Sequence, residues 1–287
     1  MHGCPGEWDL IECRQCGVIS LSPWPGSAEE IGSFYPNNYE PYQTTKSLLT
    51  NRLAAALRRL MIAPYSLRYG NPGLERPPHG GGRFLDVGCG NGLLLKRMSD
   101  CGWDTTGIDM SSLAIQAAHA NAPRASLHVG TLEDTDLEGP FDLIAMYHVL
   151  EHVPHPVECL AKCFELLAPS GVLSVCVPNV GSFEAKVFGR GWSGLDVPRH
   201  LVLFRQRVLI DILKKCGFEI ETVRPQLFPA SVSESMLLQL PSRLRKKILH
   251  TTSAHALYLL SIFPAALSYL LGNFGIMEVR ARKPSYA

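Results

Sequence analysis

Short apolar runs typical of strands alternate with helical runs from Arg83 to the C-terminus, and this alternation restricts the fold more than any other feature. Such a pattern produces strand–helix–strand crossovers, which build a mostly parallel sheet with helices on both faces. We therefore predict an α/β fold with a Rossmann-like, doubly wound sheet of seven strands. The strands are expected at 84–87, 105–108, 127–129, 141–146, 172–177, 218–223 and 275–282. The helices are expected at 93–98, 113–120, 157–167 and 208–216.

The first predicted strand runs directly into a glycine-rich loop, Asp86-Val-Gly-Cys-Gly-Asn-Gly92. The three glycines allow a tight turn and let the backbone approach a ligand without an intervening Cβ atom. Asp109 ends the second predicted strand, 17 residues after Gly92, where a carboxylate can bind two ribose hydroxyls. Ligands of parallel sheets bind at the carboxyl ends of the strands, so this loop is the predicted cofactor site.

The glycine spacing also separates classes of cofactor. A dinucleotide site needs its third glycine at position 93, which is Leu93 here, and no phosphate loop with Gly-Lys-Ser/Thr is present in the sequence. The spacing therefore disfavours a nicotinamide-dependent oxidoreductase, which stays open as an alternative. A glycine turn of purely structural use is the second alternative.

The order of these motifs resembles that of the class I S-adenosylmethionine (SAM)-dependent methyltransferases. Among them it is most similar to the branch of the ubiquinone-biosynthesis O-methyltransferases and the polysaccharide-cluster methyltransferases. The resemblance covers about residues 83–224. Its further motifs lie at 130–134, 141–144, 148–153, 169–171 and 178–179.

The resemblance implies SAM as cofactor and a site for each of its parts. Asp86 would lie under the amino group, Asp109 would bind the ribose, and His148 would form a wall of the pocket. The complete set of cofactor-binding residues implied in this way is Asp86, Gly88, Cys89, Gly90, Gly92, Asp109, Met110, Leu132, Glu133 and His148.

Methyl transfer from a sulfonium requires the acceptor and the methyl group to be held in line and water to be excluded. A hydroxyl acceptor is helped by a base of near-neutral pKa, and His152 and His200 are the candidates. His148 and His152 are four residues apart, so on a helical turn they would share a face. The motif lacks the glutamate of His-Glu-x-x-His, which disfavours zinc there. A buried histidine bonded to the backbone is the alternative for His152.

A long loop at 191–201 gathers Trp192, Asp196, Arg199 and His200. The resemblance implies that this loop lies over the acceptor, where Trp192 could stack on a ring and Arg199 could bind a carboxylate or phosphate. Alternatively, Asp196 and Arg199 pair with each other and only hold the loop together.

Residues 1–45 contain Cys13-Arg-Gln-Cys16 followed by glycine, which is half of a zinc knuckle. Cys4 offers a third thiolate, and His2 is too close to it to serve as the fourth ligand. We therefore expect either a zinc site at Cys4, Cys13 and Cys16 or a turn packed on the core. Because the N-terminus has no basic and apolar leader and the nine cysteines show no regular framework, the protein is predicted to be cytoplasmic.

Residues 46–82 combine a predicted helix with a Pro/Gly linker, and 83–287 form the predicted methyltransferase domain. An apolar insert at 225–275 precedes the last strand, and Pro264 divides its uncharged stretch, which argues against a membrane span. The segment 225–287 carries seven basic residues against two acidic ones. Contact with an anionic membrane surface at its inner face, a lid and a homodimer interface are the open interpretations. The basic residues beside the apolar stretch are Arg243, Arg245, Lys246 and Lys247.

The net charge of +1 excludes the strong basic field of a nucleic-acid-binding protein. The sequence therefore predicts methyl transfer from SAM to a small-molecule or lipid-linked acceptor, at oxygen. A catalytically silent SAM-binding scaffold of a biosynthetic complex is the alternative beside the oxidoreductase. The identity of the acceptor is left open.

Overall fold

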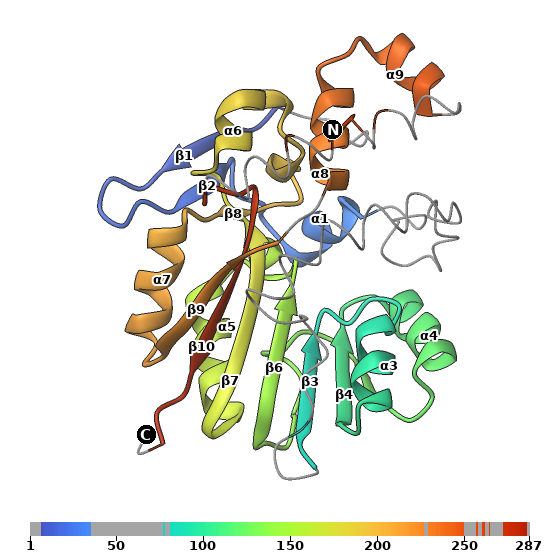
Figure 1. Cartoon of the computed structure of the whole chain (residues 1–287), viewed down its shortest axis with the longest axis vertical. Helices are drawn as coiled ribbons and strands as arrows, with labels where there is room; N and C mark the ends of the chain where they lie inside the picture. The colour runs from blue at the N-terminus through green and yellow to red at the C-terminus, as the bar shows by residue number, and fades with distance from the viewer. Residues whose placement is uncertain are drawn as a thin grey trace.

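The computed structural model describes residues 7–35, 77, 81–226, 229–249 and 272–285, with isolated positions at 257, 260, 261 and 264 (Figure 1). The predicted helix at 47–62, most of the Pro/Gly linker, most of the apolar stretch before the last strand, and Cys4 lie outside these residues.

A seven-stranded sheet forms the centre of the molecule, in the order β5-β4-β3-β6-β7-β10-β9. The pairs among β3 to β7 are parallel, whereas β10 runs antiparallel to both β7 and β9. This arrangement confirms the predicted α/β, Rossmann-like fold with seven strands. The strands are β3 (Arg83–Val87), β4 (Asp104–Asp109), β5 (Ser126–Val129), β6 (Phe141–Tyr147), β7 (Leu167–Pro178), β9 (Glu219–Pro225) and β10 (Ile276–Arg282).

Helices cover both faces of this sheet because its strands are apolar on both sides. Neighbouring residues of β3 show this, since Phe84 belongs to the core on one face and Leu85 to the core on the other. The first face is covered by α3 (Leu93–Asp100) and α4 (Ser112–Asn121). The second face is covered by α5 (Pro156–Leu166) and α7 (Gln206–Lys215).

The start of β7 differs from the prediction. We expected the strand from 172, but it begins at Leu167, directly after α5. Leu167 is buried and pairs with Phe141 on β6, while the N–H of Ser170 donates to the carbonyl oxygen of Lys283 at 3.0 Å. The Pro-Ser-Gly segment itself bulges out of the β6–β7 pairing: Ser170 has a φ angle of 65°, and the register passes from Phe141–Leu167 to Leu143–Val172, as its turn residues would suggest.

A small second sheet stands beyond the carboxyl ends of the parallel strands (Figure 1). Its strands are β1 (Asp9–Glu12), β2 (Ile19–Ser22) and β8 (Val202–Leu203), all antiparallel. The hairpin β1–β2 and the helix α1 (Ala28–Ser33) form the N-terminal unit, residues 7–35. We predicted a zinc knuckle or a turn here and did not predict the hairpin.

The remaining helices surround the upper end of the sheet in Figure 1. A short helix α6 (Phe183–Phe188) and the 3₁₀ turns η4 (Gly189–Gly191) and η5 (Ser193–Leu195) follow β7. The insert between β9 and β10 contributes α8 (Pro229–Leu238) and α9 (Ser242–Leu249). In the part of the chain that the structure describes, no helix has the length and apolar character needed to cross a membrane.

Candidate active site

The glycine loop connects β3 to α3 at the carboxyl edge of the sheet. Gly88 and Gly92 have φ angles of 72° and 75°, which side chains rarely adopt. A Cβ atom on Gly88 would lie 2.3 Å from Cγ2 of Val149, and one on Gly92 would lie 2.9 Å from the backbone of Ala118. Both the backbone conformation and the space therefore require glycine at these positions.

Asp109 ties this loop to the end of β4. Its Oδ2 accepts the N–H of Gly90 and its Oδ1 accepts the N–H of Ser111, both at 2.9 Å. Burial raises the pKa of Asp109, and these two N–H groups act in the opposite direction. A carboxylate oxygen can accept more than one hydrogen bond, so both oxygens keep acceptor capacity for the hydroxyls of a ribose.

Asp86 lies at the bottom of the same site and is only 3% exposed. Its burial, followed by the charge of Asp109, raises its pKa to about 8. A cationic group brought next to Asp86 would favour the ionised carboxylate and lower this pKa. A ligand with a ribose and an ammonium group, such as SAM, therefore fits the donors and acceptors of this edge.

The other predicted cofactor residues occupy different environments. Cys89 is buried in the loop, and burial raises the pKa of its thiol. Met110 is exposed directly after Asp109. Leu132 is 2% exposed and packs in the core, whereas its neighbour Glu133 is exposed, so only Glu133 of this pair is open to a ligand.

His148 follows β6 but does not begin a helical turn. Its φ angle is 59°, and its N–H donates to the carbonyl oxygen of Cys176 on β7 at 2.9 Å. The 3₁₀ turn η3 starts only at Leu150 and ends at His152. The predicted shared helical face of His148 and His152 is therefore wrong, because the backbone bond to β7 holds His148 outside the turn.

Glu151 lies between these histidines and is completely buried. Its Oε1 is 3.4 Å from Nδ1 of His148 and 4.0 Å from Nε2 of His200, while Oε2 has no hydrogen-bond partner among the described residues. Burial acts to raise the pKa of Glu151, but the hydrogen bond from His148 and the charges of the neighbouring histidines outweigh it, and the pKa lies below its usual value. A buried carboxylate therefore stands beside imidazole rings.

The backbone determines which nitrogen of His152 and of His200 carries a proton. Nδ1 of His152 lies 2.9 Å from the carbonyl oxygen of Arg199, and Nδ1 of His200 lies 2.9 Å from that of Gly194. Carbonyl oxygens only accept, so each Nδ1 must donate, and each neutral ring keeps its lone pair on Nε2. Burial and the nearby His200 lower the pKa of His152 to about 4.

Glu151, His152 and His200 together form a cluster that we call the Glu-His-His cluster. One donor atom from each residue lies within 4.8 Å of the other two, and the two imidazole centroids are 4.7 Å apart. Such a group can accept a proton from a bound hydroxyl, or it can hold a divalent cation. The sequence predicted both histidines but assigned no role to Glu151, for which the only signal was its place between His148 and His152.

Two residues of the loop at 191–201, Trp192 and Arg199, are buried and not open to an acceptor, which differs from the prediction. Trp192 is 0% exposed, so the predicted stacking has no open ring face here, and within the described part of the chain its Nε1 has no hydrogen-bond partner. Arg199 is 2% exposed and forms a bidentate ion pair with Asp196. The structure thus favours the alternative in which this pair holds the loop, rather than Arg199 binding the acceptor.

Helix α8 of the insert fastens the same loop from outside. The N–H of Ser193 donates to Oγ of Ser235 at 2.9 Å, and the hydroxyls of Ser193 and Ser231 are 3.0 Å apart. The amide of Gln239 donates to the carbonyl oxygen of Phe188 at 2.7 Å. The beginning of the insert therefore supports the loop that carries His200.

Cys13 and Cys16 lie exposed at the turn of the β1–β2 hairpin. Backbone N–H groups of Cys16 and Gln15 lower the pKa of the Cys13 thiol. Within the residues described, the Glu-His-His cluster is the one group of three side chains that could bind a metal ion. No third described ligand therefore lies beside the thiols of Cys13 and Cys16. The predicted third thiolate, Cys4, lies outside the described residues.

Tyr35 is a site residue that sequence reasoning missed. Its hydroxyl oxygen lies 2.9 Å from Nδ1 of His152, and the two rings meet edge to face. The aromatic segment around Tyr35 gave no signal of this contact, because 117 residues separate the partners.

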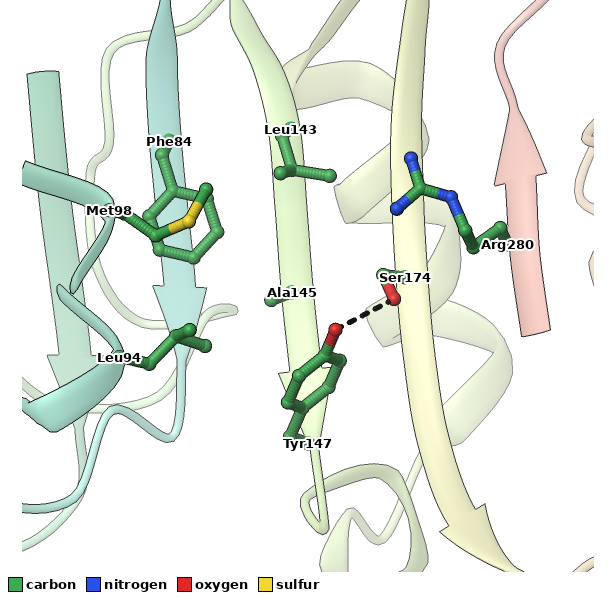
Figure 2. A pocket seen from close by; sticks show the side chains of 8 residues that line it. All are labelled: Phe84, Leu94, Met98, Leu143, Ala145, Tyr147, Ser174 and Arg280. Atoms are coloured by element: carbon green, nitrogen blue, oxygen red, sulfur yellow. Dashed lines mark hydrogen bonds between the residues drawn. The ribbon is translucent and has the colours of Figure 1, made fainter. Parts of the chain in front are cut away.

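Figure 2 shows a pocket away from this site, on the face of the sheet that carries α3. Its polar groups bond to each other, since the hydroxyls of Tyr147 and Ser174 are 3.2 Å apart and Ser174 donates to buried Glu278 at 2.8 Å. This network joins three strands and satisfies a buried carboxylate. The lining residues are Phe84, Leu94, Met98, Leu143, Ala145, Tyr147, Ser174 and Arg280.

Comparison with known families adds to this geometry. Residues 48–223 match the model of a family described as a methyltransferase domain. The chain is 39% identical over 118 residues to the ubiquinone biosynthesis O-methyltransferase of Caulobacter sp. (strain K31), which covers 39% of this chain and 47% of that relative. The chain therefore spans about half the length of that relative.

Two further similarities extend over more of the molecule. The ubiquinone biosynthesis O-methyltransferase of Cereibacter sphaeroides is 30% identical over 200 residues, 66% of this chain and 76% of the relative. Among solved structures, phosphoethanolamine N-methyltransferase 2 of Haemonchus contortus, in complex with S-adenosyl-L-methionine, superposes with a TM-score of 0.52. It shares 21% identity and covers 79% of this chain and 52% of that one, a similarity of fold alone.

Proposed function

The chain belongs to the class I SAM-dependent methyltransferases, and from this premise we propose that it transfers the methyl group of SAM to a hydroxyl group of a small-molecule or lipid-linked acceptor. The observation that carries the choice of oxygen is the Glu-His-His cluster. Its segment lies against the glycine loop, where the side chain of Val149 fills the space beside Gly88. Groups able to activate a hydroxyl therefore stand next to the proposed cofactor site.

On the cofactor side, SAM would supply an electrophilic methyl group on a sulfonium. Asp109 would accept the ribose hydroxyls, and Asp86 would face the ammonium group. Asp86 is buried and Asp109 is half-buried in the same edge, so binding of the cation would relieve the repulsion between them. The role of these residues is to orient the cofactor, since the sulfur leaves as a neutral group and needs no proton.

On the acceptor side, we assign the base to His200. His152, with a pKa of about 4, is a weak base at neutral pH and serves better to orient the acceptor. Nε2 of His200 is 4.0 Å from Oε1 of Glu151, too far for a hydrogen bond, so its lone pair remains for the acceptor hydroxyl. After proton transfer, the carboxylate of Glu151 would stabilise the imidazolium.

A divalent cation in the cluster is the second candidate for the same step. Two imidazoles whose Nδ1–H groups are fixed by carbonyl oxygens, beside a carboxylate with an unpaired oxygen, are typical of metal ligands. A cation there would lower the pKa of a bound acceptor hydroxyl, so that no side chain would have to act as the base. Dialysis against a chelator separates the two: the cation hypothesis requires turnover to be lost and to return with added metal.

The first test is calorimetric titration with S-adenosylhomocysteine, the product of SAM, with NADH as the comparison ligand. Binding of the homocysteine compound alone supports the proposal, and NADH binding would revive the oxidoreductase. Transfer of labelled methyl groups to hydroxylated aromatic and lipid-linked acceptors then tests turnover. Binding without turnover on any acceptor would favour the silent scaffold.

Once an acceptor is known, His200→Ala should lower turnover by about 10²- to 10⁴-fold. His119→Ala, an exposed histidine on α4, is the matched control and should leave turnover unchanged. Full turnover in both His200→Ala and His152→Ala would remove the base assignment.

We make two further proposals: the insert contacts a membrane surface, and the N-terminal thiols bind zinc. Helix α9 exposes Leu244 beside Arg243, which supports contact with an anionic membrane surface. Sedimentation with anionic liposomes at low and high salt tests it, and absence of binding at low salt would leave the lid or a homodimer interface. Metal analysis of the purified chain tests zinc at Cys13 and Cys16.

A further inference from the structure

The N-terminal unit, residues 7–35, lies outside the family match, which begins at residue 48, yet it is joined to the acceptor side of the site. β2 pairs with β8, with Ser20 opposite Val202. The N–H of Leu21 donates to the carbonyl oxygen of Leu201 at 2.9 Å, and Leu201 directly follows His200. The N–H of Leu201 in turn donates to the carbonyl oxygen of Glu151 at 2.8 Å. One run of backbone bonds therefore connects the N-terminal unit to two members of the cluster.

Apolar burial and one ion pair fix the unit in this place. Leu21 and Phe34 are almost fully buried, and Trp8 meets Phe34 edge to face. The guanidinium of Arg205 donates to both carboxylate oxygens of Glu12, at 2.6 and 2.9 Å. Because Phe34 is buried, the following residue, Tyr35, has a defined position over the cluster.

Tyr35 and the carbonyl of Arg199 both lie 2.9 Å from the same nitrogen, Nδ1 of His152. If Nδ1 carries the proton, it donates to the carbonyl oxygen and the phenol oxygen together. If Nδ1 carries the lone pair, that lone pair points at the carbonyl oxygen, which is repulsive. The two oxygens thus hold the imidazole at Nδ1, and the lone pair of the neutral ring stays on Nε2.

We propose that the N-terminal unit forms the acceptor-side wall of the active site and that Tyr35 is a positioning residue, which holds His152 as the Nδ1–H tautomer. The inference rests on the proposed methyl transfer for its effect on turnover. Its structural part, the tautomer of His152, is independent of any activity.

The variant Tyr35→Phe keeps the ring and removes only the hydroxyl. Long-range ¹H–¹⁵N spectra of protein labelled at histidine report the tautomer, and His152→Gln assigns the signal among the ten histidines. We expect the ¹⁵N signals of His152 to shift in Tyr35→Phe and to stay in place in Tyr147→Phe, which removes a phenol hydroxyl from the network of Figure 2. Unchanged His152 signals in Tyr35→Phe would overturn the proposal.

The kinetic consequence follows from the loss of one hydrogen bond. Turnover of Tyr35→Phe should fall about two- to tenfold, with the KM for SAM and the affinity for S-adenosylhomocysteine within about twofold of the original protein. A shifted His152 signal with unchanged turnover would also contradict the positioning role. If no acceptor is methylated at all, the proposed function fails while the spectra still decide the contact.

Discussion

Asp109→Ala is the substitution that tests the cofactor site most directly. Asp109 is proposed to bind the ribose through hydrogen bonds to a charged acceptor, and such bonds are worth about 1.5–3 kcal/mol each. Loss of one such bond should weaken binding of S-adenosylhomocysteine by about 10- to 200-fold. Calorimetric titration at neutral pH measures this change.

Stability should change much less than affinity. The substitution deprives the N–H groups of Gly90 and Ser111 of their acceptor, but both residues are partly exposed, so water can replace the carboxylate. It also removes the charge of Asp109, which raises the pKa of Asp86, and this offsets part of the cost. A folded protein with weakened binding is therefore the expected outcome, and a denaturant titration checks the folded state.

Asp104→Ala is the matched control, since Asp104 is an exposed carboxylate at the opposite end of the same strand. It should leave the affinity unchanged. If Asp109→Ala binds S-adenosylhomocysteine within about twofold of the original protein, the ribose assignment is wrong.

Two other predictions use the same edge of the sheet. Because the pKa of Asp86 is raised to about 8, the folded protein binds an extra proton between about pH 4 and pH 8, and its free energy of unfolding should fall as pH rises through this range, by at most about 1.4 kcal/mol per pH unit. Urea titrations at pH 6 and pH 8 measure this change in the free energy of unfolding. Asp86→Asn should reduce the change, whereas Asp104→Asn should preserve it. An equal change in the original protein and both variants would show that burial does not raise the pKa of Asp86. Gly92→Ala should lower stability by about 1 kcal/mol or more and weaken cofactor binding, because its Cβ would press on the backbone of Ala118. Gly81→Ala, with open space around it, is the control and should leave the unfolding temperature unchanged in the same thermal scans.

The cofactor half of the site could be predicted because its residues are close together in the sequence. The glycine loop and Asp109 lie at strand ends, and the alternation of strands and helices places strand ends at one edge. Helix α5, predicted at 157–167 and found at Pro156–Leu166, shows how well the apolar period defines such elements. Periodicity carries no information on pairing, however, so the place of β10 between β7 and β9 could not be deduced.

The acceptor half could be predicted only in part: His152 and His200 were expected there, but their contacts could not be deduced, because these join segments far apart in the sequence. Tyr35 contacts His152 across 117 residues, and Glu151 and His200 come from separate segments of the chain. The residue types of the loop at 191–201 suggested ligand contacts, but burial decides their role, and Trp192 and Arg199 both turned inward. No local pattern distinguishes a tryptophan that stacks on a ligand from one that fills the core.

The position of β10 has a consequence for synthesis on the ribosome. Among the strands of the described residues, β9 has β10 as its one neighbour, and a stretch of fifty residues separates Pro225 from Ile276. While the chain emerges, β7 therefore presents an unpaired edge, and β9 has no strand to join until the last strand has been translated. The cofactor edge at β3 and β4 is complete long before this point. A nascent chain could thus acquire its cofactor pocket early and yet remain exposed to edge-to-edge aggregation until β10 closes the sheet.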